Sequence, residues 1–237
     1  MIYELDITAN IHDADYNGVI RASALMRYIQ TAAQNQLTEN GMSYEELRDK
    51  YKKAFLLSRI RLDFSEPIRA YDRITALTYP CESKAYSFLR CYAIKKDSEI
   101  IGRAVALWAL VDTETHGLVK ARSFDLGLEV HEPHELALER FYMPSELSCV
   151  GEYEVRYGDV DQNRHMNNTK YPDMYSSFLP LENKRIRAMA INYHNEAPMG
   201  ERLRVLSACR EENKYYFRTL REDGKINSEA EILLENL

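Results

Sequence analysis

Residues Asp159–Asn168 read DVDQNRHMNN, and a related stretch, DADYNGVIRA, begins at Asp13. The two stretches share Asp, Asp and Asn at one constant offset, since 159 − 13 = 146. This offset pairs Asp15 with Asp161 and Asn17 with Asn163. The repeat predicts an internal duplication of one structural unit. The copies differ at one informative position, because Val19 stands where the second copy has His165.

A second, weaker similarity lies downstream of each copy. The segment FSEPIRAYDRI resembles HNEAPMGERLRV, and this pairs Glu66 with Glu196 after a small shift in offset. The same order of elements is also predicted in both halves, which strengthens the case for duplication.

Helices follow both polar stretches in this prediction. Apolar residues recur at three- and four-residue spacing from Leu25 to Leu37, and Gly41 ends that helix. Ser43 and Glu46 form a capping box that opens a second short helix. In the second half, a short helix is expected over Asn168–Phe178.

Strands with alternating apolar residues fill most of the remaining chain. In the run FLLSRIRLDF, we expect Leu56, Ile60, Leu62 and Phe64 to share one face. The strands expected in the two halves are 3–11, 55–64, 72–79, 85–94, 100–112, 152–157, 185–194, 202–209, 214–221 and 226–234.

A helix with an apolar face, followed by long antiparallel strands, predicts a sheet wrapped around that helix. We therefore expect an α+β protein with two tandem hot-dog domains, each an antiparallel sheet wrapped around a central helix. The expected boundaries are 1–128 for the first domain, 129–149 for a connector and 150–237 for the second domain.

Composition narrows the class of protein. The 237 residues are 45% hydrophobic and carry a formal net charge of −6, which disfavours nucleic acid as a partner. No apolar run is long enough to span a membrane, and the N-terminus lacks the features of a signal peptide. Four scattered cysteines are expected to be buried thiols in a reducing cytoplasm: Cys81, Cys91, Cys149 and Cys209.

The segment DVDQNRHMNNTKY, from Asp159 to Tyr171, resembles the D-L-D-x-N-x-H-x-N-N-x-x-Y signature of acyl-acyl carrier protein thioesterases from plant plastids and bacteria. Residues 25–37, 103–121 and 191–198 extend the resemblance over most of the chain. It implies a tandem hot-dog enzyme that hydrolyses the thioester of fatty acyl-acyl carrier protein (acyl-ACP) and releases free fatty acid. The second domain would carry the catalytic groups, and the first would hold the acyl chain.

The resemblance also implies roles for individual residues. Asp161, Asn163 and His165 match the motif, and Glu196 matches the acid on the following strand, so these four are the expected catalytic residues. Ala197 stands where the family has a cysteine once proposed as the nucleophile. This difference favours a mechanism in which water is activated, with no cofactor and no metal.

The chemistry of a thioester agrees with this mechanism. A thiolate with a pKa of about 8.5 leaves readily, so the main requirements are an activated water and a stabilised oxyanion. Glu196 or His165 could take the proton from water, and the sequence does not decide between them. Backbone amides near Asn167 and Asn168 are candidate substrate contacts, although both residues are equally suited to capping the helix.

Alternative interpretations remain open at this point. The polar stretch could be an ordinary loop that bonds its own backbone. An acyl-thioester hydratase resembles D-x-N-P-x-H, with one more residue between Asn and His and a Pro that this chain lacks. Acyl-coenzyme A could replace acyl-ACP as substrate, and a non-catalytic acyl-binding protein is the remaining rival.

Partners follow from the same considerations. Acyl carrier protein is the expected partner, and the basic clusters RDKYKK and NKRIR could receive this acidic protein or could be solvated surface charge. The protein is expected to be a monomer or a homodimer. Tyr171 and Trp108 are expected to be packed core residues without a catalytic role.

Overall fold

The computed structural model describes all 237 residues, which form two compact units. The first unit consists of Met1–Ala9, Met26–Glu66 and Tyr71–Leu138. The second unit consists of Asn10–Leu25, Pro67–Ala70 and Glu139–Leu237. The polar stretch near Asp13 therefore groups with the second unit, together with Asp159–Asn168. The sequence-based domain boundaries at 128 and 150 stay a prediction.

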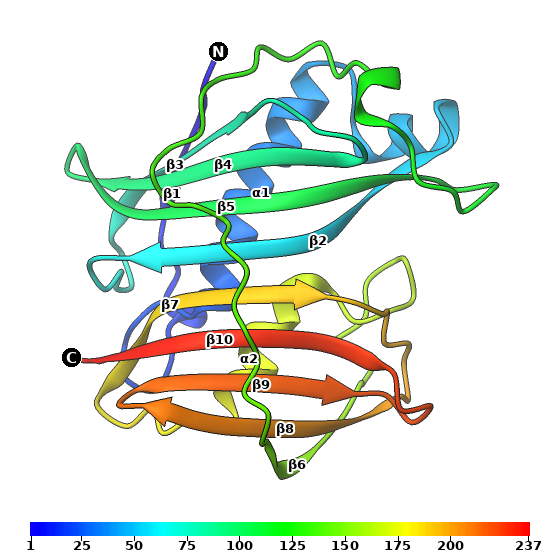
Figure 1. Cartoon of the computed structure of the whole chain (residues 1–237). Helices are drawn as coiled ribbons and strands as arrows, with labels where there is room; N and C mark the ends of the chain where they lie inside the picture. Colours follow the sequence, from blue (N-terminus) through cyan, green and yellow to red (C-terminus); the bar gives the residue numbers. More distant parts are fainter. The chain divides into compact units, whose positions relative to one another are not determined.

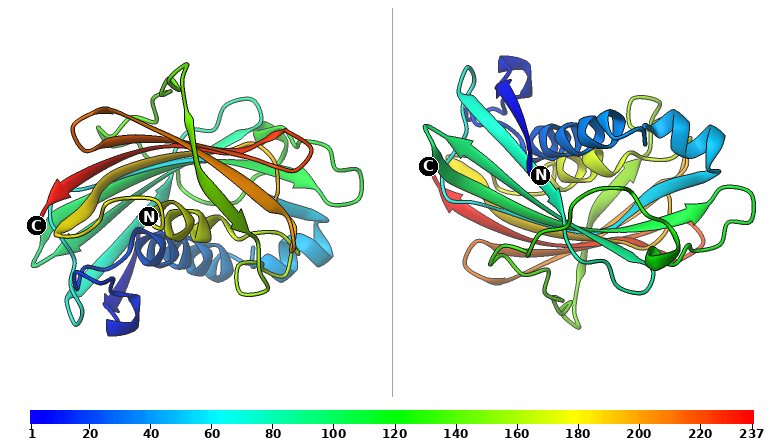
Figure 2. Two further views of the ribbon diagram at one scale, coloured as in Figure 1. Left: turned by 90° about the horizontal axis from the view of Figure 1, so that it is seen from below. Right: turned by 90° about the horizontal axis from the view of Figure 1, so that it is seen from above.

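The first unit holds an antiparallel sheet in the order β1-β3-β4-β5-β2. The long helix α1 runs along one face of this sheet (Figure 1), as the view from above also shows (Figure 2). Its buried side chains include Met26, Ile29 and Ala32. The elements of this unit are β1 (Tyr3–Thr8), α1 (Ala22–Glu39, whose first turn groups with the second unit), η2 (Glu46–Lys50), β2 (Lys53–Phe64), β3 (Arg73–Pro80), β4 (Ser87–Lys96), β5 (Glu99–Asp112) and η3 (Ala121–Ser123).

The second unit holds an antiparallel sheet in the order β7-β10-β9-β8-β6. The short helix α2 lies against it (Figure 2). The rings of Tyr175 in α2 and Phe217 in β9 pack with their centroids 5.0 Å apart and their planes tilted by 40°. The elements are η1 (Ile11–Asp13), β6 (Ser148–Glu154), η4 (Asn168–Lys170), α2 (Tyr171–Ser176), β7 (Lys184–Tyr193), β8 (Arg202–Glu211), β9 (Lys214–Leu220) and β10 (Ile226–Asn236). The prediction of two tandem hot-dog folds is confirmed.

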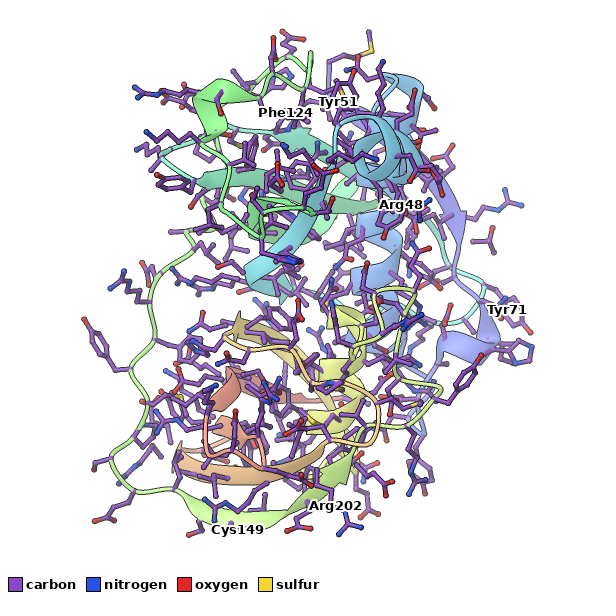
Figure 3. All side chains as sticks on the ribbon, turned by 90° about the vertical axis from the view of Figure 1, so that its right-hand side faces the viewer. Arg48, Tyr51, Tyr71, Phe124, Cys149 and Arg202 are labelled. Atoms are coloured by element: carbon purple, nitrogen blue, oxygen red, sulfur yellow. The ribbon has the colours of Figure 1, made fainter.

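The capping box is confirmed at the start of the short helix after α1. The Ser43 N–H donates to Glu46 at 3.0 Å, and the Glu46 N–H donates to the Ser43 hydroxyl at 3.2 Å. Just beyond this helix, Tyr51 meets Phe124 edge to face at 5.6 Å (Figure 3). The chain after β5 thus folds back onto the end of the sheet.

The predicted face of β2 is wrong at one position. Ile60, Leu62 and Phe64 are buried as expected, but Leu57 is buried in place of Leu56. The pairing between β2 and β5 shifts between Leu57 and Arg59, so one extra residue in β2 reverses the alternation upstream of it.

Three further expectations need correction. The first strand of the second unit covers Ser148–Glu154, earlier than the predicted 152–157. It is an edge strand with mostly exposed side chains, so it lacks the alternation that marks a strand in sequence. Among the cysteines, Cys81 and Cys91 are buried, whereas Cys149 and Cys209 are exposed. The predicted helix 168–178 is shorter, with a 3-10 turn before α2.

Gly102 of β5 provides a test of this packing. It lies opposite Phe64, and an added Cβ would stand 2.1 Å from the Phe64 Cδ1 atom. We expect Gly102→Ala to lower the free energy of unfolding by about 1–3 kcal/mol, because the ring must move. Gly117→Ala is the control, since its nearest contact would be 3.4 Å away. Urea denaturation measures both, and equal stability of the two variants would contradict the packing.

Candidate functional site

Asp161 organises the polar loop from within. Its Oδ1 accepts the Asn163 N–H at 2.8 Å, and its Oδ2 accepts the side-chain amide of Asn167 at 2.9 Å. Its backbone N–H donates to the His165 carbonyl at 3.2 Å, and its carbonyl accepts the Arg164 N–H at 2.9 Å. Arg164 adopts a left-handed φ of 66°, which closes the turn. The carboxylate therefore fixes the loop that presents His165.

Asn167 ends the loop and starts the helical segment. Its side-chain oxygen accepts both the N–H and the hydroxyl of Thr169, at 2.9 and 2.7 Å. Its backbone N–H donates to the Asp159 carbonyl at 2.9 Å. The capping role of Asn167 is thereby confirmed. The predicted substrate contacts of Asn167 and Asn168 stay a prediction, and the carbonyl of Asn168 accepts the Tyr193 hydroxyl at 2.9 Å.

A backbone connection brings Glu196 to His165. The Met166 N–H donates to the Ala197 carbonyl at 2.8 Å, and His165 forms an antiparallel bridge with Pro198. As a result, the His165 Nε2 lies 3.4 Å from the Glu196 Oε1. The Glu196 side chain is 62% exposed and that of His165 is 21% exposed, so solvent reaches the pair. Two groups 31 positions apart in sequence thus meet at the surface of the second unit.

The stretch near Asp13 has the same loop geometry. Asp15 Oδ1 accepts the Asn17 N–H at 2.9 Å, the Asp15 N–H donates to Val19, and the Ile20 N–H donates to Ile68. Each bond has its counterpart in the second copy, and every residue within the loop is related to its counterpart by the offset of 146. The bridge of Val19 with Arg69 corresponds to that of His165 with Pro198, which gives an offset of 129 downstream, since 198 − 69 = 129. The predicted pairing of Glu66 with Glu196 is therefore wrong by one residue.

Side chains in and beside the first copy bond other parts of the second unit. The Asn17 side chain donates to the carbonyls of Leu181 and Lys184, at 2.6 and 2.9 Å. Ser23 donates to Asp173 on α2 at 2.6 Å. Within the second unit, this copy supports the helix and the turn that follows it.

A buried polar layer lies beneath the pair, and sequence patterns did not indicate it. Asn227 of β10 is fully buried and donates to the Tyr171 hydroxyl at 3.0 Å and to the Asn195 carbonyl. Tyr171 and Tyr193 meet edge to face at 5.0 Å. The expectation that Tyr171 is a core residue is confirmed. Burial raises the pKa of Tyr171 to about 12, and the charge of Glu196 also raises it.

Ala197 has no exposed surface, and its carbonyl is engaged by Met166. Trp108 of the first unit is partly buried and donates to the Tyr92 hydroxyl at 3.3 Å, as expected for a packed strand residue.

No group of three or more His, Cys, Asp or Glu residues converges in a way that could hold a metal ion. None of the helices combines the length and the apolar character that a membrane crossing requires.

Comparison with known protein families assigns the chain. The model described as the acyl-ACP thioesterase N-terminal domain matches residues 2–122, and the one described as the acyl-ACP thioesterase C-terminal domain matches residues 142–236. The chain belongs to the acyl-ACP thioesterase family. This thioesterase is a thioester hydrolase that acts on fatty acyl-ACP.

Solved structures share the fold of this thioesterase. An acyl-ACP thioesterase from Bacteroides thetaiotaomicron has a TM-score of 0.87 at 20% identity, over 99% of this chain and 98% of the other. A putative oleoyl thioesterase from Lactobacillus plantarum has a TM-score of 0.83 at 19% identity, over 100% of this chain and 97% of the other. The 12:0-ACP thioesterase from Umbellularia californica has a TM-score of 0.83 at 17% identity, over 100% of this chain and 98% of the other. A comparison with curated protein sequences found no match.

Exchanging a donor and an acceptor tests the loop of the thioesterase. In Asp161→Asn, one carboxylate oxygen becomes an NH₂ group, so two NH₂ donors would face each other at positions 161 and 167. Asn167 cannot turn its oxygen towards position 161, because that oxygen accepts hydrogen bonds from Thr169. We expect the free energy of unfolding to fall by about 1 kcal/mol, because a partly buried donor loses its partner. Adding Asn167→Asp restores a donor–acceptor pair and should recover most of the loss. Thermal denaturation followed by circular dichroism measures this, and a double variant less stable than either single variant would contradict the arrangement.

Proposed function

We propose that this thioesterase releases the fatty acid by direct attack of a water molecule, with Glu196 as the general base and His165 as its partner. The observation that carries the proposal is the 3.4 Å approach of the His165 Nε2 to the Glu196 Oε1 where solvent reaches both groups. Asp161 and Asn163 complete the proposed catalytic set.

The proposed reaction needs little help with the leaving group. Water attacks the thioester carbonyl carbon while the Glu196 carboxylate accepts its proton. The tetrahedral intermediate then collapses, the carbon–sulfur bond breaks, and the proton passes from Glu196 to the departing sulfur. The products are the free fatty acid and the pantetheine thiol of the carrier.

His165 suits the role of orienting Glu196. An ionised carboxylate is only an acceptor, so in this scheme the imidazole Nε2 carries the hydrogen that faces Glu196 and orients the carboxylate. The second carboxylate oxygen then faces outward to water. This arrangement needs no covalent intermediate, which agrees with the buried Ala197 at the position of the family's cysteine.

Asp161 and Asn163 act through the loop in this scheme. The two carboxylate oxygens of Asp161 accept hydrogen bonds from Asn163 and Asn167. In this scheme Asp161 therefore positions His165 by closing the loop, and it does not bond the imidazole. The exposed Asn163 side chain is proposed to orient the water or the thioester carbonyl. Asn167 enters as the residue that connects this loop to η4, and Asn168 remains a candidate substrate contact.

We propose that the thioesterase meets acyl-ACP in the cytoplasm and prefers it to acyl-coenzyme A. Both present the same pantetheine arm to the site. The two basic clusters are partly neutralised within their own units, because Lys53 pairs with Asp112 at 2.6 Å and Arg185 pairs with Glu235. These ion pairs favour solvated charge over carrier docking at those clusters. Equal kcat/KM for the two carriers with one acyl chain would remove the preference for acyl carrier protein.

The base is tested by Glu196→Gln, which keeps the shape of the side chain. We expect kcat on acyl-ACP to fall by about 10²- to 10⁴-fold, because the amide cannot accept a proton from water. His165→Ala should also lower kcat, since Glu196 then loses its partner. Released thiol and free fatty acid are both measured.

The control for this test is Glu154→Gln, which changes an exposed carboxylate of the same unit and should leave turnover unchanged. Near-full activity of Glu196→Gln would return the base role to His165. Absence of release by the wild-type protein with every chain length would refute the hydrolytic proposal itself.

A further inference from the structure

Asn227 lies buried between the two segments that carry the proposed catalytic pair. Its side-chain nitrogen donates to the Asn195 carbonyl, one residue before Glu196, and to the hydroxyl of Tyr171, the first residue of α2. Its side-chain oxygen accepts the Thr219 hydroxyl at 2.9 Å. The amide is thus held on both sides and cannot rotate without losing a bond.

The backbone of Asn227 holds the same segment again. Its carbonyl accepts the N–H groups of His194 and Asn195, at 2.8 and 3.1 Å. Asn195 is therefore bound through its N–H by the backbone of Asn227 and through its carbonyl by the side chain. The residue directly after this clamp is Glu196.

The second hydrogen bond of the Asn227 side chain, to Tyr171, connects it to the segment that follows His165. Tyr171 follows η4, which begins where the His165 loop ends, and the Tyr193 hydroxyl donates to the Asn168 carbonyl at 2.9 Å. Burial raises the pKa of Tyr171, the hydrogen bond from Asn227 lowers it, and the charge of Glu196 adds to the rise. One buried amide therefore spans from the Glu196 segment to the helix that follows His165.

We propose that Asn227 is a positioning residue, which holds the Glu196 segment against the His165 loop. This inference rests on the proposed function of the pair. Burying an amide costs free energy unless every polar atom is bonded, and a fully bonded network makes a core rigid and unique. The hydrogen bonds of Asn227 are thus suited to fixing the position of the Glu196 segment relative to the His165 loop. An apolar residue at position 227 could only fill the space.

Two buried tyrosines offer a matched test. Tyr171→Phe removes the hydroxyl that Asn227 bonds, and Tyr92→Phe in the first unit removes a hydroxyl bonded by Trp108 at 3.3 Å. Both rings are buried, so the loss of stability should be similar. We expect kcat to fall about tenfold in Tyr171→Phe with KM within a factor of about two, since misplacement by 1 Å can cost about 10²-fold. Tyr92→Phe should keep wild-type kcat, and equal kcat in the two variants would overturn the proposal.

Asn227→Asp adds a readout that a purely structural role would not give. The neutral acid has one hydrogen to donate to Asn195 or Tyr171, whereas the ionised form has none. Burial and the nearby Glu196 charge both raise the pKa of the introduced carboxyl. The ratio of variant to wild-type kcat should therefore rise as the pH falls through that raised pKa. A ratio that does not change with pH would contradict the positioning role.

A crystal structure of Asn227→Ala tests the geometry without relying on activity. We expect the distance from the His165 Nε2 to the Glu196 Oε1 to lengthen beyond 4 Å, the limit for an ion pair. An unchanged distance in a folded variant would overturn the inference, and Tyr171→Phe serves in its place if Asn227→Ala does not fold. Lack of hydrolysis by the wild-type protein would instead refute the proposed function and leave this distance test valid.

Discussion

The hydrogen bond from the Met166 N–H to the Ala197 carbonyl, 2.8 Å long, joins two chain segments that are otherwise distant in sequence. Because these two residues each follow a proposed catalytic residue, this bond sets His165 beside Glu196. The groups around it maintain that register. Asp161 closes the loop on one side, and Asn227 clamps the residue before Glu196 on the other.

The same backbone bond occurs a second time, between Ile20 and Ile68. There the neighbouring side chain is Val19. Asn17 of the loop bonds the turn after α2, and Ser23 at the start of α1 bonds α2. One loop scaffold therefore supports two different tasks. The geometry comes from the Asp and the backbone, which both copies share, whereas the proposed chemistry depends on one position, which is Val19 in the first copy and His165 in the second.

Much of this architecture could be predicted from the sequence. Periodicity located α1 and the long strands, because their apolar residues face a core, and the offset of 146 located both loops. Details that depend on pairing between strands could not be predicted. The shift that buries Leu57 instead of Leu56 arises from one extra residue in β2, which no pattern within the strand reveals.

The site itself was only partly visible in sequence. His165 and Asp161 stand in a dense polar motif, and Glu196 was found through a family resemblance. Asn227 is one of several polar residues in β10, so only its buried contacts identify it. Glu66 was paired with Glu196 because both are glutamates, although the bridge partners set Pro67 at that position.

The central claim is that His165 and Glu196 work as one unit, and a double-mutant cycle tests it most directly. The measurement is kcat/KM on acyl-ACP for His165→Ala, Glu196→Gln and the double variant. Residues that act as a unit give non-additive losses. We predict that the double variant is no slower than the more damaged single variant. Losses that multiply would show independent actions and contradict the account.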